Sequence, residues 1–225
     1  MSIEPRTTTF ILASASPRRN ELIRLTGWSA LVCPVEVDEL PLQDETAEEL
    51  VRRLALTKAR TAILSCDESG VFLAADTVVV DGQRLLGKPL DQTEAREMLW
   101  ELRGREHRVL TTLVIIDQQD QREIFMMCES SVPMRRYTMD EVDAYINSGS
   151  PLDKAGAYGI QDSFNPVAME CFHDCYANVM GLPLCHLVNA MRRLGHSPFI
   201  DVPVECQAYL DYDCSIYKEI LGDRA

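Results

Sequence analysis

Long apolar runs, an excess of basic residues and a recognisable secretory leader are all missing from this sequence. No segment approaches the roughly 18 apolar residues that a membrane-spanning helix needs, and residues 1–10, MSIEPRTTTF, lack the basic and apolar regions of a signal peptide. Lysine and arginine total 22 against 35 aspartate and glutamate residues, a formal net charge of −13. These absences argue against membranes and nucleic-acid polymers as partners, and we expect a cytoplasmic protein.

Cysteine is present at eight positions, but paired metal-binding spacings are not evident. In a cytoplasmic chain we expect these thiols to be reduced. Cys171, His173, Cys175, Cys185 and His186 lie close together in the sequence. They lack the two well-separated ligand pairs typical of zinc sites, so buried thiols are the favoured interpretation and a zinc interaction module is kept as an alternative.

Strand and helix patterns alternate along the 225 residues, without internal repeats, which predicts an α/β fold. Capping boxes at Thr46/Glu49 and Thr138/Glu141 mark two helix starts, and Asp81-Gly82 marks a hairpin turn. We expect helices over about 17–27, 47–65, 92–103, 139–148 and 184–194, and strands over about 10–14, 71–80, 83–87, 107–116 and 122–132. Residues 1–196 are expected to form one domain, followed by an acidic extension over 197–225 that is either docked or mobile.

The segment ILASASPRRNELI, residues 11–23, places two serines and two arginines between a short strand and a helix. Ser16 is a candidate N-cap and Pro17 suits the first helical position. Unpaired N–H groups at a helix start favour an anion, and arginine suits bidentate phosphate contact. Ser14, Ser16, Arg18 and Arg19 therefore make a candidate polyphosphate site; an ordinary helix cap with solvated arginines is the alternative.

Two charged residues break the apolar pattern of the element that carries them. Lys58 falls in the middle of the apolar stripe of the 47–65 helix, where its ammonium must either reach out to solvent or meet an anion. Asp76 lies inside the apolar strand VFLAADTVVV. A buried carboxylate is costly unless a cation, a metal or a cleft relieves it, so both residues are candidates for a functional site.

Weaker candidates lie in three loops. Lys88 follows the hairpin that contains Asp76, so the pairing brings it toward that strand. Glu39 lies in an acidic loop and offers the carboxylate oxygen that Mg²⁺ prefers, and Gln161 ends a Gly-rich segment and carries both a donor and an acceptor for a base edge. Each is also compatible with an ordinary solvated loop.

Seven segments, taken in order, resemble the Maf nucleotide pyrophosphatases, also called septum formation inhibitor proteins. They run from about residue 9 to 195: LASASPRRNELI, VDE at 37–39, LALTKA at 54–59, AADTVVV, GKPLDQTEA, DKAGAYGIQ and NVMGLPL. The resemblance implies hydrolysis of a nucleoside triphosphate to the monophosphate and pyrophosphate. It also implies a divalent cation (Mg²⁺ or Mn²⁺), a homodimer, and an elongated mixed sheet with flanking helices in two lobes around a cleft, as in the inosine triphosphatase-like fold.

The same resemblance implies roles for individual residues. Asp76 would be the general base, alone or beside a metal that Glu39 helps to hold, and Arg19, Lys58 and Lys88 would bind phosphate. Arg18, Thr77 and Gln161 match the branch that acts on dTTP and UTP rather than the one that acts on 7-methyl-GTP.

Three residues depart from the family pattern: Asp162, Thr112 and Ala177 stand where Gly, Gly and a polar residue are usual. Asp162 bears most on function, because a carboxylate next to Gln161 would alter base preference or repel phosphate. Two alternatives stay open, a 7-methyl-GTP pyrophosphatase and a non-catalytic nucleotide-binding regulator of cell division.

Overall fold

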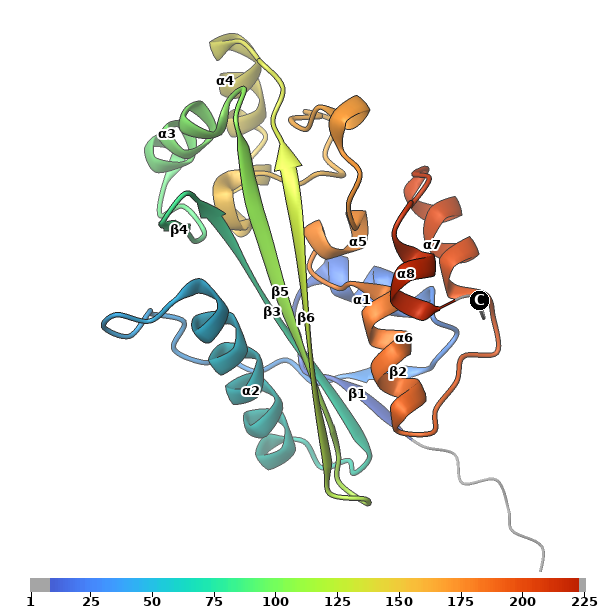
Figure 1. The fold of residues 1–225 in the computed structure, drawn as a ribbon. Helices are drawn as coiled ribbons and strands as arrows, with labels where there is room; N and C mark the ends of the chain where they lie inside the picture. Colours follow the sequence, from blue (N-terminus) through green and yellow to red (C-terminus); the bar gives the residue numbers. More distant parts are fainter. Residues whose placement is uncertain (1–8, 223–225) are drawn as a thin grey trace, which may run out of the picture.

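Three long antiparallel strands run through the whole molecule in the computed structural model, which describes residues 9–222 (Figure 1). They are β3 (Val71–Asp81), β5 (Glu106–Asp117) and β6 (Arg122–Pro133), joined as successive neighbours. The β5–β6 register pairs Glu106 with Pro133 and Asp117 with Arg122, so this hairpin is paired over its full length. The sheet therefore has a central ribbon that reaches both ends of the protein.

Shorter strands complete the sheet at the open edge of β3. Strands β1 (Phe10–Leu12) and β2 (Ala30–Val32) add in parallel at one end, whereas β4 (Arg84–Leu86) pairs antiparallel with the other end. The order is β2-β1-β3-β5-β6, with β4 beside β3. The expected α/β fold with a mixed sheet is confirmed.

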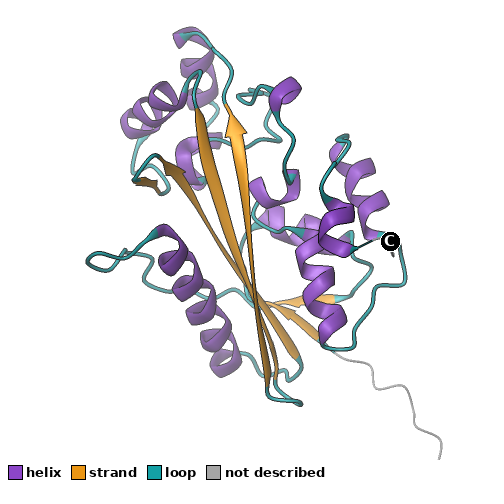
Figure 2. Ribbon diagram, viewed as in Figure 1, coloured by secondary structure: helices purple, strands orange, loops and turns teal. Residues whose placement is uncertain are grey.

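Helices cover both faces of this sheet (Figure 2). Helix α2 (Ala47–Ser65) lies on one face, where its alanines pack against alternate residues of β3 such as Phe72 and Ala74. The opposite face carries α6 and the larger core. The remaining helices are α1 (Pro17–Arg24), α3 (Gln92–Leu102), α4 (Met139–Asn147), α5 (Tyr176–Val179), α6 (Leu184–Arg193), α7 (Val202–Leu210) and α8 (Tyr217–Leu221), with 3-10 turns η1 (Ser150–Asp153), η2 (Ala155–Ala157) and η3 (Met169–Cys171).

The sequence signals for element ends are confirmed where side chains cap the backbone. Ser16 accepts a hydrogen bond from the Arg19 N–H at the start of α1, and both capping boxes form, at Thr46 and at Thr138. Strand β2 and helices α5, α7 and α8 are elements that the sequence patterns did not predict.

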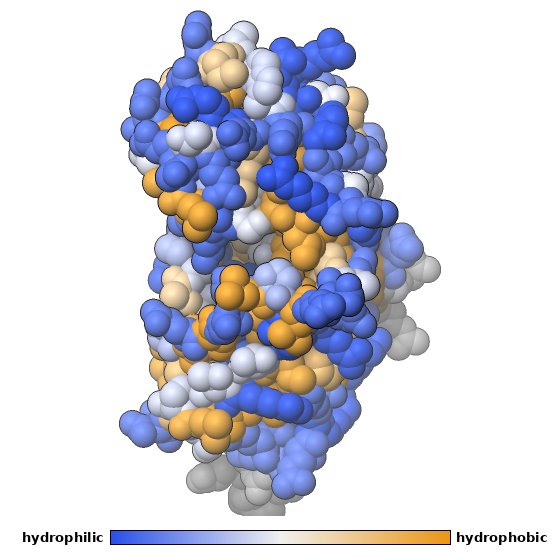
Figure 3. Space-filling model, turned by 90° about the vertical axis from the view of Figure 1, so that its left-hand side faces the viewer, coloured by the Kyte–Doolittle hydropathy of each residue, from blue (hydrophilic) through white to orange (hydrophobic). Residues whose placement is uncertain are grey.

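Two lobes share the long strands. One contains α2, β1 and β2, and the other contains β4, α3, α4 and the Gly-rich turns η1 and η2 (Figure 1). The face seen in Figure 3 is indented across its middle, between the two lobes. The cleft expected from the family resemblance thus lies between α2 and the β4–α3 side.

The acidic C-terminal extension is docked, as far as residue 222. Asn189 of α6 donates to the Ile220 carbonyl at 2.7 Å, and the Tyr212 hydroxyl donates to the Phe172 and Asp174 carbonyls at 3.2 and 3.1 Å. Residues 1–8 of the expected domain and 223–225 of the extension lie outside the described residues.

The expectation that every thiol is reduced is wrong for two cysteines. Cys33, directly after β2, and Cys66, the C-cap of α2, form a disulfide. Their Cα atoms are 6.5 Å apart, a separation that such a bond can span. The bond ties the loop that follows β2 to the end of α2.

The other thiols do not assemble a metal site within residues 9–222: no group of three or more His, Cys, Asp or Glu side chains there is arranged to hold a metal ion. Cys175 and Cys185 are buried, whereas Cys171 is exposed. In the same part of the chain, no helix is both long and apolar enough to cross a bilayer.

His107 is a buried histidine that contacts the Gly-rich segment and should make the folding stability depend on pH. Its ring on β5 is buried and hydrogen-bonds the Tyr158 hydroxyl at 2.7 Å. Burial lowers the pKa of His107 to about 4, from an ordinary value of 6.5. Between pH 6.5 and 4 the unfolded chain binds a proton that the folded chain does not, so folding stability falls as pH decreases through this window.

We expect His107→Gln to flatten this part of the pH–stability curve by about 3 kcal/mol. The measurement is urea unfolding at intervals from pH 7.5 to 4, compared with the wild type. His173→Gln, at an exposed position, is the control. Identical pH slopes for the wild type and His107→Gln would show that His107 is not the group responsible.

Candidate active site

A gap in the hydrogen-bonded edge of β3 places polar residues inside the cleft. Strand β1 reaches Leu73, where the Ala13 N–H still donates to the Leu73 carbonyl at 2.8 Å. Strand β4 begins to pair only at Val79. Between these two partners, residues 74–78 of β3 have β5 on one side only among the described strands, and Asp76 and Thr77 lie in this stretch.

The start of α1 lies at this gap because β1 ends beside Leu73 and the chain turns at once. The Ser14 hydroxyl accepts from the Ser16 N–H at 3.1 Å, and the Ser16 hydroxyl accepts from the Arg19 N–H at 3.4 Å. Pro17 occupies the first turn. Both serine hydroxyls therefore shape the turn, and the positive end of the helix dipole faces the cleft.

Arg19 extends from this turn across the edge of the sheet. Its Nε donates to the Gly181 carbonyl at 2.8 Å and its Nη2 donates to the Thr77 hydroxyl at 3.1 Å. Thr77 shares a further hydrogen bond with Thr111 on β5, at 2.9 Å. Burial lowers the pKa of Arg19, against the opposing charge of Asp76.

Arg18 points elsewhere, although it is the next residue. Its Nη1 pairs with the Asp153 carboxylate at 2.9 Å, and its Nη2 donates to the Asp153 carbonyl at 3.4 Å. Asp153 belongs to η1 in the Gly-rich segment of the other lobe. Arg18 therefore links the α1 turn to that segment across the cleft.

Asp76 and Lys58 form a buried ion pair between β3 and α2. The Lys58 Nζ lies 2.5 Å from Asp76 Oδ1 and 2.6 Å from Glu39 Oε1. The exposed fractions of the Lys58 and Asp76 side chains are 11% and 8%. Lys58 thus meets two anions rather than solvent, and Glu39 joins the pair from the loop before α2.

The pKa values of the two carboxyl groups, Asp76 and Glu39, are shifted in opposite directions. Burial raises the pKa of Asp76, although the charges of Lys58 and Arg19 oppose the rise. Burial acts in the same direction on Glu39, but the hydrogen bond and charge of Lys58 outweigh it, and the pKa of Glu39 is lowered. Asp76 is therefore the better proton acceptor of the two once it is ionised.

Lys88 lies at the rim of this cluster. It comes two residues after Leu86, which pairs with Val79, and its Nζ is 4.0 Å from Glu39 Oε2. Its side chain is 60% exposed. Lys88 is therefore a cation at the cleft whose side chain is mostly in contact with water.

The carboxylates of Glu39 and Asp76 fit a hard divalent cation by their chemistry. Oxygens of both lie within 2.6 Å of the same Lys58 Nζ, so they converge on one small region. Mg²⁺ is commonly held by one or two carboxylates together with substrate phosphates. Two protein carboxylates are thus enough for a cation that arrives with a triphosphate.

Gln161 lies at the end of the Gly-rich segment. The η2 turn earlier in this segment packs on β3. Gly156 of η2 donates to the Gly87 carbonyl at 3.0 Å and approaches Val79 closely with a φ of +69°. Gln161 itself is exposed, and its Nε2 donates to Asp162 Oδ1 at 3.1 Å. Its direct contact is therefore with the residue that departs from the family pattern.

The structure brings the sequence-predicted residues together in two groups. Glu39, Lys58, Asp76 and Lys88 form the first. Ser14, Ser16, Arg19 and Thr77 form the second, beside the α1 turn, whereas Arg18 and Gln161 lie on the side of the Gly-rich segment.

Two residues at the site were missed by the sequence reasoning. Gly181 contributes only a carbonyl oxygen, to Arg19, and Asp153 pairs with Arg18 from a position 135 residues away. The NVMGLPL segment, which contains Gly181, was the only signal for the first.

Similarity to known proteins extends over most of this chain. A family model described as "Maf-like protein" matches residues 9–194. A dTTP/UTP pyrophosphatase of Dehalococcoides mccartyi (strain ATCC BAA-2266 / KCTC 15142 / 195) is 43% identical over 189 residues, covering 84% of this chain and 83% of the relative. One of Methanococcoides burtonii is 40% identical over 192 residues, covering 85% and 97%.

Similarity to solved structures is weaker. The Ham1 protein of Staphylococcus aureus has a TM-score of 0.37 at 13% identity, over 56% of this chain and 71% of that one. A nucleoside-triphosphatase / dITP/XTP pyrophosphatase of Mycobacterium abscessus has a TM-score of 0.37 at 15% identity, over 57% and 73%.

Replacing Lys58 tests the buried ion pair. We expect Lys58→Met to lower the free energy of unfolding by about 3 kcal/mol at pH 7, because it leaves the Asp76 carboxylate buried beside a methionine. Adding Asp76→Asn to this variant removes the unpaired charge and should restore most of the loss. The measurement is urea unfolding of the wild type, both single variants and the double variant.

Lys88→Met is the matched control, because its side chain is exposed and 4.0 Å from its acidic neighbour. It should change the free energy of unfolding by less than about 0.5 kcal/mol. If Lys58→Met and the double variant are equally unstable, the pair is not coupled as the geometry indicates.

Proposed function

The chain belongs to the Maf-like protein family, and we propose that it hydrolyses dTTP and UTP to the monophosphate and pyrophosphate. The observation that carries the proposal is a buried carboxylate, Asp76, set in an open sheet edge next to a helix N-terminus and three cations, Arg19, Lys58 and Lys88. The relatives reported above are named for this activity. Their similarity extends over most of both chains.

In the proposed reaction Asp76 accepts a proton from the water that attacks the α-phosphorus. The bond from the α-phosphorus to the oxygen that bridges to the β-phosphorus breaks, and pyrophosphate leaves. The raised pKa of Asp76 strengthens it as a base while it remains ionised above that pKa. The activity should therefore decrease when the pH falls through the pKa of Asp76.

We assign phosphate binding to the cations around Asp76. Arg19 and the α1 turn with Ser14 and Ser16 face the cleft from one side, and Lys58 and Lys88 face it from the other. Fixed cations that meet the leaving pyrophosphate lower the barrier by offsetting its negative charge. Arg18, Thr77 and Gln161 are proposed to set the base preference.

A divalent cation, Mg²⁺ or Mn²⁺, is proposed as the cofactor, with Glu39 and Asp76 as its protein ligands. When bound, it would neutralise charge on the triphosphate and lower the pKa of bound water. A homodimeric assembly and a cytoplasmic location are further proposals. The first rests on the family resemblance and the second on the composition, whereas the Cys33–Cys66 disulfide argues against the second.

Asp76→Asn is the variant that tests the mechanism. We expect pyrophosphate release from dTTP and UTP to fall by roughly 10²–10⁴-fold, because the amide cannot accept the proton. The assay uses Mg²⁺ or Mn²⁺ with dTTP, UTP, CTP, dATP, GTP and 7-methyl-GTP. Nucleotide binding, measured by calorimetry, should persist in the variant.

Asp81→Asn is the control, since Asp81 ends the same strand and pairs with Arg105 outside the cleft. Wild-type turnover in Asp76→Asn would make Asp76 a structural residue. Release from 7-methyl-GTP alone would keep the chemistry and refute the base assignment, and no release from any nucleotide would favour the non-catalytic regulator.

A further inference from the structure

Asp162 holds the side chain that is proposed to read the base. Its carboxylate is 15% exposed and has two differently engaged oxygens. Oδ2 accepts from the Tyr145 hydroxyl at 2.5 Å and the Ser150 hydroxyl at 3.0 Å. Oδ1 accepts from Gln161 Nε2 at 3.1 Å. Oδ2 is thus held by Tyr145 and Ser150, and Oδ1 holds the side-chain amide of Gln161.

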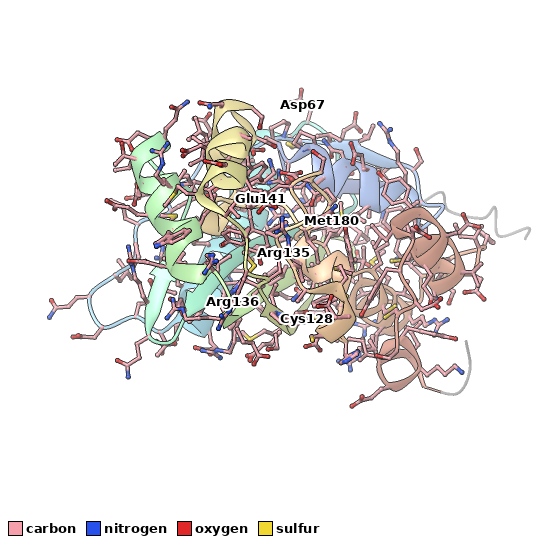
Figure 4. The ribbon with its side chains drawn as sticks, turned by 90° about the horizontal axis from the view of Figure 1, so that it is seen from above. Asp67, Cys128, Arg135, Arg136, Glu141 and Met180 are labelled. Atoms are coloured by element: carbon pink, nitrogen blue, oxygen red, sulfur yellow. A yellow bond between two sulfur atoms is a disulfide. The ribbon has the colours of Figure 1, made fainter. Side chains whose placement is uncertain are left out.

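The support behind Asp162 is well packed. The Tyr145 ring of α4 stacks on Phe164 with centroids 4.5 Å apart and planes at 11°. Arg135 donates to the Phe164 carbonyl and pairs with Glu141 of α4, both at 2.8 Å (Figure 4). The Gly159 N–H also donates to the Tyr145 hydroxyl at 3.1 Å, so the loop that carries Asp162 is attached to α4 both before and after the carboxylate.

The hydrogen bond to Asp162 determines which end of the Gln161 amide, donor or acceptor, faces away from Asp162. The amide has an acceptor, Oε1, and a donor group, Nε2, of nearly the same shape. A flip would place Oε1 against the Asp162 carboxylate, so the donor end stays on Asp162. Because Gln161 is exposed, its Oε1 acceptor is open to a ligand on the other side.

We propose that Asp162 is a positioning residue that locks the Gln161 amide and thereby favours uracil and thymine over cytosine. Uracil and thymine carry an N–H donor at N3, which matches a fixed acceptor, whereas cytosine carries an unprotonated N3. A site with a fixed polar pattern discriminates against a base with the wrong pattern because its own groups are left unpaired. This inference rests on the proposed function and adds the device that sets its selectivity.

Charged contacts join this lock to the phosphate side of the cleft. The Lys154 Nζ is 3.5 Å from Asp162 Oδ2 and 2.7 Å from Asp153 Oδ1. Asp153 in turn pairs with Arg18 at 2.9 Å. A continuous network from Arg18 to Gln161 therefore fixes the distance between the α1 turn and the base-reading amide.

The contact between Asp162 and Gln161 also requires a glycine at position 159. A Cβ at this position would lie 2.7 Å from Asp162 Oδ1 and 2.8 Å from Gln161 Nε2. Such a contact would push the two side chains apart. Gly159→Ala thus offers a second way to break the lock without removing either side chain.

The experiment measures the ratio of kcat/KM for UTP to that for CTP in the wild type, Asp162→Asn, Gly159→Ala, Gln161→Ala and the Asp162→Asn/Gln161→Ala double variant. Asparagine can donate as well as accept, so the amide of Gln161 can then adopt either orientation. We expect Asp162→Asn to lower the ratio roughly tenfold, mainly through KM, and Gly159→Ala to act in the same direction. In the Gln161→Ala background, Asp162→Asn should have no further effect on the ratio.

Asp143→Asn is the matched control, since it removes another carboxylate of the same lobe, one that pairs with Arg96 at 2.7 Å, and should leave the ratio unchanged. Thermal unfolding of each variant checks that it folds. An unchanged ratio in Asp162→Asn overturns the proposal, as does the same change with and without Gln161. An equal change of KM for both nucleotides would instead show repulsion of phosphate by Asp162. Absence of UTP hydrolysis by the wild type would refute the proposed function itself, a result separate from these.

Discussion

A carboxylate inside a hydrophobic sheet needs a cation close by, and in this chain Lys58 meets that need for Asp76. Neither residue is tolerable alone at its depth, because an unpaired buried charge costs several kcal/mol. The pair therefore fixes how α2 lies on β3, and Glu39 is drawn to the same Nζ. The opposite charges of these three residues thus meet where α2 packs on β3.

The open stretch of β3 explains why this cluster can face a ligand. Strand β1 stops at Leu12 because the serine-proline turn begins α1, and β4 starts later because its hairpin returns only to Val79. Backbone and side chains between these points are not covered by a neighbouring strand on that edge. Ligands of α/β proteins commonly bind beyond the carboxyl ends of strands, and here the end of β1 supplies such a place next to a long strand.

Elements with strong local signals were predictable from the sequence, and elements held by tertiary contacts were not. Helices α2 and α4 carry capping boxes, and Asp81-Gly82 marks a tight turn. Strand β2 is only three residues long and mostly exposed, so its apolar residues show no alternation that would mark a strand. Helix α7 has only two buried residues, Val202 and Pro203, although its N-cap Asp201 is a local signal.

The site shows the same division. Lys58 and Asp76 were found because each violates the apolar pattern of its own element. Gly181 acts through a carbonyl oxygen, which every residue has, and the Arg18–Asp153 pair joins segments that no periodicity relates. Such contacts depend on how the lobes meet, and a sequence pattern does not contain that information.

The adjacent arginines of the α1 turn connect the two halves of the site. Successive residues of a helix point about 100° apart, and Arg18 and Arg19 contact different partners. Arg19 turns to Thr77 and Gly181 beside Asp76, and Arg18 turns to Asp153 in the Gly-rich segment that ends at Gln161. The two adjacent arginines thus connect the α1 turn to two different parts of the cleft, rather than both contacting phosphate. One turn of helix sets the separation between the group proposed to break the anhydride bond and the group proposed to select the base.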